Sequence, residues 1–265
     1  MPLPGCGRKK DAPHSFPLAA KENRMSIPFV PKEYSFIECT GFRLWHSHNE
    51  PKSHIELIIE AASYALDQIC NRLRFKNLRK IEICLYHSNE QAVSSLDRRI
   101  PGNMAMAPYS TNKGSLIIVQ NAMADSMNGD LQRMRRVLAH EICHLFVREK
   151  SCSSSFLGDG LKDMKVRPWI DEGLAEYLSW RCIGKRNPIL QNHFEYINNL
   201  DEVDRFLNDF NADERTAAFY TSTRLVESFI KELGLINFFE SMTKLSETGQ
   251  LPTVAFTATS KSRRA

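Results

Sequence analysis

The segment 130–150 reads DLQRMRRVLAHEICHLFVREK, and its apolar residues recur at intervals of three and four positions. This periodicity predicts an amphipathic helix with one face turned toward a core. His140 and His144 lie four positions apart in this segment, and Glu141 directly follows the first histidine. Residues four apart project from the same side of a helix, so the two imidazoles can share one metal ion with the Glu141 carboxylate beside them.

A second segment, 169–177, supplies further carboxylates. It reads WIDEGLAEY and begins a second expected helix over about 170–181, with Glu172 in its first turn and Glu176 one turn later. A catalytic zinc site uses three protein ligands and keeps a fourth position open, which makes Glu172 the candidate third ligand. Glu176 is expected to accept an N–H from a ligand histidine and so fix its tautomer. The alternative is that both glutamates are solvated acids favoured by the helix dipole.

Taken together, the HExxH motif and the WxxEGLAEY-type segment resemble the gluzincin zinc metallopeptidases, most closely the peptidase-MA-like domains. The resemblance implies an α+β, zincin-like fold with a thermolysin-type catalytic core, a small mixed sheet with an edge strand, and a helical C-terminal part. It implies that His140, His144 and Glu172 bind Zn²⁺, that Glu141 is the general base, and that Glu176 supports a ligand from the second shell. The implied activity is hydrolysis of a peptide or protein substrate.

The same resemblance reaches two other segments. Residues 218–222 read AFYTS, where similar proteins carry a tyrosine whose hydroxyl stabilises an oxyanion, so Tyr220 is a candidate catalytic residue. The alternative for Tyr220 is a half-buried core aromatic. His193 is a second candidate for this role, with an interior or capping position as the favoured alternative. The strand 115–119, SLIIV, takes the place of the family's edge strand, to which an extended substrate adds by backbone pairing.

The chain also departs from the aminopeptidase branch of this family. The interval before Glu172 is longer, and residues 102–107, GNMAMA, lack the glutamate of that branch's GxMEN motif. Because an anchor for a free amino group is missing, endopeptidase activity is expected rather than aminopeptidase activity. The competing hypothesis is a catalytically inactive, zinc-bearing peptide-binding module of the same fold. The intact Glu141 counts against it, because a merely structural site has no use for that carboxylate.

Hydrophobic periodicity and turn residues predict the remaining elements. The expected elements are hairpin strands at 34–39 and 42–46, a helix at 54–73, a half-buried strand at 81–86, a loop from Pro101 to Gly114, and helices at 192–207 and 215–233, the last ended by Gly234. Strands precede helices, which indicates an α+β fold. We expect one catalytic domain over 31–245, divided into an α/β part at about 31–125 and a helical part at about 126–245. A flexible leader at 1–30 and a disordered tail at 246–265 would flank it.

Composition narrows the possible partners and compartments. The 265 residues include 42% hydrophobic and 25% charged residues, as in ordinary globular proteins. The 35 basic and 31 acidic residues are interspersed, which argues against nucleic-acid binding, and no apolar run is long enough for a membrane span. Seven cysteines without a CxxC pair favour reduced thiols and a cytoplasmic location. The string Leu3-Pro4-Gly5-Cys6 resembles the end of a lipoprotein signal, so export is the alternative if the true N-terminus is longer.

Overall fold

The computed structural model describes residues 30–74, 80–88, 90–91, 106–111, 114–120, 130–151, 166–191, 194–209 and 213–248. The expected leader up to residue 29 and positions 249–265 of the expected tail lie outside these residues. The described elements, in chain order, are β1 (Ser35–Cys39), β2 (Phe42–His46), α1 (Lys52–Leu73), β3 (Ile81–Tyr86), β4 (Met106–Thr111), β5 (Gly114–Gln120), α4 (Leu131–Ser151), α5 (Pro168–Cys182), the 3-10 helix η1 (Pro188–Gln191), α6 (Leu200–Asn208), α7 (Arg215–Leu233) and α8 (Leu235–Thr248).

The five strands form one mixed sheet in the order β1-β2-β3-β5-β4. The hairpin expected from the sequence is confirmed, since β1 and β2 pair antiparallel with Cys39 opposite Phe42. Strands β2, β3 and β5 run parallel to one another, and β4 pairs antiparallel with β5. The sheet therefore has a parallel centre between two antiparallel edges.

The expected position of the edge strand is wrong. The strand at 115–119 lies inside the sheet as part of β5, and β4 forms the edge within a stretch that was expected to be a loop. Pro108 concealed this strand, because proline lacks the N–H that a strand's ladder needs. An edge strand tolerates this loss, and the β4–β5 register shifts between Met106 and Tyr109, the stretch that contains Pro108.

The strand β3 is buried along its whole length, not on one face as its alternating sequence suggested. It lies between two parallel neighbours, and such central strands are normally covered on both faces. Its polar residue Glu82 is accommodated by partners: Trp45 Nε1 donates a hydrogen bond of 2.6 Å to Glu82 Oε2, and Arg43 Nη1 lies 3.5 Å from Oε1. Burial raises the pKa of Glu82 despite these contacts.

Two expectations in the helical part also need correction. The helix α6 begins at Leu200 rather than at 192, because Asn199 caps it by accepting a 2.9 Å hydrogen bond from Asp201 N. After Gly234, whose φ of +78° ends α7, the chain starts another helix, α8, which the sequence analysis missed and which includes residues 246–248 of the expected tail. The buried face of α8 includes Phe238, Phe239 and Met242.

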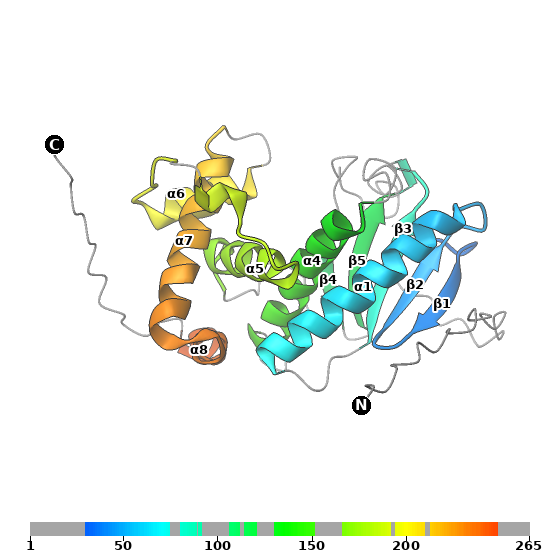
Figure 1. The fold of residues 1–265 in the computed structure, drawn as a ribbon, viewed down its shortest axis with the longest axis horizontal. Coiled ribbons are helices and arrows are strands. Elements are labelled where there is room, and N and C mark those ends of the chain that lie inside the picture. Colours follow the sequence, from blue (N-terminus) through cyan, green and yellow to red (C-terminus); the bar gives the residue numbers. More distant parts are fainter. Residues whose placement is uncertain are drawn as a thin grey trace, which may run out of the picture.

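The helix α4 lies between the two parts of the molecule. Figure 1 shows α1 and α4 beside the sheet, with α5, α6, α7 and α8 gathered on the other side of α4. The helix α4 packs against α1 and α5, and α5 packs against α7. One cluster of buried apolar residues runs from the sheet through α4 to α7 and α8. No described helix combines the length and apolar character needed to cross a membrane.

At Gly173, α5 lies close against α7. A β-carbon at this position would lie 2.6 Å from the Ser222 carbonyl oxygen and 2.8 Å from Val226 Cγ2. We expect Gly173→Ala to lower the free energy of unfolding by about 1–3 kcal/mol, because overpacking forces the helices apart. Urea denaturation measures this change. The control Thr216→Ala, on the exposed side of α7, should change it by less than about 0.5 kcal/mol. Equal stability of the two variants would contradict this packing.

Candidate metal centre

Three side chains from α4 and α5 converge on one point. His140 Nε2 lies 3.2 Å and His144 Nε2 3.7 Å from the same oxygen, Glu172 Oε2. The two imidazole rings stand nearly perpendicular, with centroids 4.7 Å apart and an interplanar angle of 81°. One ligand atom from each residue lies within 4.8 Å of the others, so the group could hold a metal ion. The structure thus brings together the three residues that the sequence suggested as ligands.

The convergence follows from two helices that run antiparallel with matching spacing. Side chains four positions apart on α4 face side chains four positions apart on α5, in reverse order. The contacting pairs along α4 are Arg136 with Trp180 and Glu176, His140 with Glu176 and Glu172, and His144 with Glu172 and Asp171. Both helices repeat every 3.6 residues. Equal four-residue spacing on α4 and α5 therefore keeps successive pairs of side chains in contact along the two helices.

Each histidine has its own carboxylate behind it. His140 Nδ1 lies 3.2 Å from Glu176 Oε1, and His144 Nδ1 lies 2.7 Å from Asp171 Oδ1. A carboxylate at Nδ1 holds the proton there and leaves Nε2 to bind a metal. Glu176 was predicted for this role from the sequence, but Asp171 was not. The signal was present in the sequence, because the residue before Glu172 is acidic and the second histidine also needed a partner.

Glu176 is itself held by three donors. Trp180 Nε1 and Asn187 Nδ2 donate hydrogen bonds of 3.0 Å and 3.1 Å to Glu176 Oε2, and Arg136 Nη1 lies 3.4 Å from Oε1. Trp180 and Asn187 thus occupy Oε2, while Arg136 shares Oε1 with His140 Nδ1. Glu176 therefore has a fixed orientation in which one oxygen remains directed at the imidazole.

The charges of the site favour a cation between the ligands. Burial alone would raise the pKa of Glu172, but the charges of His144 and His140, together with Arg215, outweigh burial and lower that pKa to about 2. Burial alone would lower the pKa of His140, but Glu172 and Glu176 raise it well above its usual value. The carboxylates of Glu172 and Glu176 thus stabilise positive charge on the His140 imidazole, which lies between them. Arg215, at the start of α7, is a further charged neighbour that the sequence analysis did not find.

One unpaired atom and the distances of the site fit a metal ion. Glu172 Oε2 is buried and has no hydrogen-bond partner among the described residues. A buried carboxylate oxygen without a donor is costly unless a cation takes its place. Donors arranged tetrahedrally at about 2.1 Å from zinc lie about 3.4 Å apart. The two nitrogen–oxygen separations of 3.2 Å and 3.7 Å bracket this value, and all three donor atoms lie within 4.8 Å of one another. Two nitrogens with one oxygen form a donor set that zinc enzymes use.

The other predicted catalytic residues are placed as follows. Glu141 follows His140 on α4 and is buried, with 8% of its surface exposed. Tyr220 lies on α7, where its ring contacts Phe194 at a centroid distance of 5.9 Å and the Arg224 guanidinium at 5.5 Å. These contacts are not with the three ligand residues, so the catalytic role of Tyr220 stays a prediction. His193 lies outside the described residues, as do positions 102–105 of the GNMAMA segment.

Comparison with protein-family models and with curated proteins finds no match to this chain. The likeness of its two motifs to the gluzincins therefore stays a hypothesis. What supports a metal centre is the arrangement of His140, His144 and Glu172 and of the carboxylates behind them.

We expect Asp171→Asn to weaken zinc binding by about 10- to 100-fold, because loss of a carboxylate behind a ligand histidine releases its ring orientation. Competition with a chromophoric zinc chelator measures the dissociation constant. The matched control is Asp67→Asn, which removes an exposed carboxylate on α1 and should leave zinc affinity unchanged. Equal affinity in both variants would show that Asp171 does not support His144.

Proposed function

We propose that the protein is a zinc-dependent metallopeptidase of the gluzincin type with a zincin-like fold. The observation that carries this proposal is that His140 Nε2 and His144 Nε2, on the helix that also carries Glu141 of the HExxH motif, lie 3.2 Å and 3.7 Å from the same oxygen, Glu172 Oε2. Neither helix alone could form this group, because its donors come from both α4 and α5. We propose endopeptidase rather than aminopeptidase activity, because the sequence lacks the GxMEN glutamate.

In this proposal His140, His144 and Glu172 hold the metal. A zinc ion bound there supplies Lewis-acid chemistry, which makes water acidic at neutral pH and polarises a carbonyl group. Glu141 accepts the proton of the attacking water and later gives it to the leaving amine. Asp171 and Glu176 keep the two imidazoles in one orientation throughout, because both remain in contact with Nδ1.

The edge of the sheet offers a place for an extended peptide. The strand β4 forms this edge, and α4 packs against it. An edge strand carries unpaired backbone donors and acceptors, and an added peptide strand can pair with them. We therefore propose β4, rather than β5, as the strand that positions the substrate beside the histidines.

The proposal is tested by separating metal binding from catalysis. We expect Glu141→Gln to keep one zinc per chain but to lose peptide hydrolysis by about 10²- to 10⁴-fold, because it removes the group that transfers the proton. We expect His140→Ala to lose both zinc and activity. Native mass spectrometry gives the metal content, and cleavage of a peptide library gives the activity.

Two results would contradict the proposal. A folded wild-type protein that binds no zinc would exclude the metal centre. A protein that binds one zinc and binds peptides, but cleaves no peptide in the library, would instead be the inactive binding module of the same fold.

Tyr220 has a separate test. If its hydroxyl stabilises the developing oxyanion, Tyr220→Phe should lower kcat by about 10²- to 10³-fold with little change in KM. Steady-state kinetics on a cleaved peptide measures both constants. Tyr64→Phe serves as the control, because Tyr64 lies on α1 and donates its hydroxyl proton to the Cys182 carbonyl oxygen. Unchanged kcat in Tyr220→Phe would assign this residue to packing against Phe194 and Arg224.

A further inference from the structure

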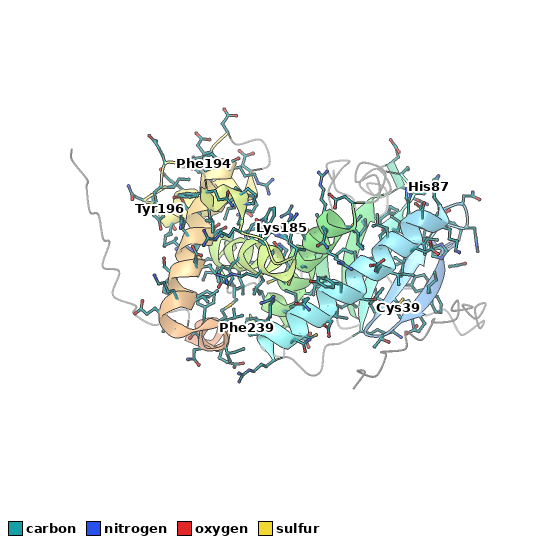
Figure 2. The ribbon with its side chains drawn as sticks, viewed as in Figure 1. Cys39, His87, Lys185, Phe194, Tyr196 and Phe239 are labelled. Atoms are coloured by element: carbon teal, nitrogen blue, oxygen red, sulfur yellow. The ribbon has the colours of Figure 1, made fainter. Side chains whose placement is uncertain are left out.

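A cavity with a volume of about 690 Å³ lies where the end of α5, the turn that follows it, η1 and α7 meet. Five of its twelve described lining residues are basic and one is acidic. The basic residues are Arg72, Arg181, Lys185, Arg186 and Arg224, and the acidic one is Glu227. Figure 2 shows Lys185 near the middle of the molecule, close to α5. We call this space the cationic cavity.

Most of these cations have no anionic partner within the described part of the chain. The carboxylate of Glu227 lies 3.4 Å from Arg224 Nη1, and Arg224 Nη2 donates a 3.0 Å hydrogen bond to the Leu190 carbonyl oxygen. Arg181, Lys185 and Arg186 form no ion pair with a described carboxylate. Arg72 donates to the Arg181 carbonyl oxygen, and its Nε is buried without a hydrogen-bond partner.

This arrangement favours an anionic ligand. Like charges that line one concave wall repel one another and attract counter-charge from solution. Guanidinium groups present paired N–H donors that match the two oxygens of a carboxylate. The cations come from α1, from the end of α5 with the turn after it, and from α7. Because they are spread over three elements, they suit several separate carboxylates better than one compact ion.

Hydrogen bonds link the wall of the cationic cavity to Glu176, the carboxylate behind His140. Trp180 and Asn187 line the cavity, and both donate hydrogen bonds to Glu176, which contacts His140. Trp180 lies eight residues beyond Glu172 on α5, a distance of about 12 Å along a helix. An extended peptide advances about 3.3 Å per residue, so it covers this distance in about four residues.

We propose that the cationic cavity binds the acidic side chains of a peptide substrate about four residues from the bond that is cleaved. This inference rests on the proposed peptidase function. The rings of Tyr177 and Trp180 add aromatic surface to the same wall. The cavity then selects substrates that carry a cluster of Asp and Glu on one side of the scissile bond.

Binding is tested without catalysis. The full chain carrying Glu141→Gln is titrated against a fluorescein-labelled decapeptide of alternating Glu and Ala, and against its Gln and Ala counterpart, by fluorescence anisotropy. We expect the acidic peptide to bind at least about tenfold more tightly than its neutral counterpart, and we expect its binding to weaken with added salt.

Adding Lys185→Glu and Arg186→Glu to this chain should abolish the preference for the acidic peptide. The matched control adds Lys231→Glu and Arg205→Glu, exposed charges on α7 and α6, and should keep it.

Equal loss of binding in the cavity variant and in the control would overturn the proposal, because it would reflect net charge alone. Inorganic phosphate that displaces no acidic peptide, yet protects the protein against thermal unfolding only when Lys185 and Arg186 are present, would also overturn it. That result would assign the cavity to a small anion.

Cleavage by the wild-type chain separates this inference from the proposed function. We expect library peptides with Asp or Glu about four residues from the cut to have kcat/KM values at least about tenfold higher, and Lys185→Glu with Arg186→Glu to remove this preference while neutral peptides are still cut. Cleavage without an acidic preference would overturn the cavity assignment and leave the peptidase proposal intact. No cleavage of any peptide would overturn both.

Discussion

The arrangement of this molecule depends on one buried carboxylate oxygen, Glu172 Oε2, which faces His140 Nε2 at 3.2 Å and His144 Nε2 at 3.7 Å. A buried oxygen without a hydrogen-bond donor is unfavourable, so this contact requires positive charge at the same point. The two imidazoles come from α4, beside the sheet, while the carboxylate comes from α5. The contact therefore lies at the interface between α4 and α5.

Several further layers of contact hold this point in place. Asp171 and Glu176 stand behind the two imidazoles, and Trp180, Asn187 and Arg136 hold Glu176 in turn. The donors restrict the rotation of the Glu176 carboxylate, and the two carboxylates restrict the rotation of the imidazoles. Proteins orient metal-binding histidines by contacts of this kind. The same chain of contacts reaches the wall of the cationic cavity, so the ligand residues and the cavity share a common support.

Close packing brings α7 into this arrangement. Gly173, next to Glu172, has no side chain to separate α5 from the Ser222 carbonyl of α7. The close approach lets the first residue of α7, Arg215, add its charge to the field around Glu172, which lowers the pKa of that carboxyl. A glycine in a helix interior costs about 0.5–1 kcal/mol relative to alanine, and here it permits a contact that a larger residue would exclude.

The sequence by itself determined the features that depend on local spacing. The four-residue intervals of His140 and His144, and of Glu172 and Glu176, place each pair on one helix face wherever the helices lie, and the 3.6-residue repeat fixed α1, α5 and α7 almost to the residue. Only the tertiary structure decided that Asp171 backs His144, that β4 covers the outer side of β5, and that five cations surround one cavity. These contacts join residues far apart in the chain, and no periodicity within a segment encodes which distant partner will fold against it.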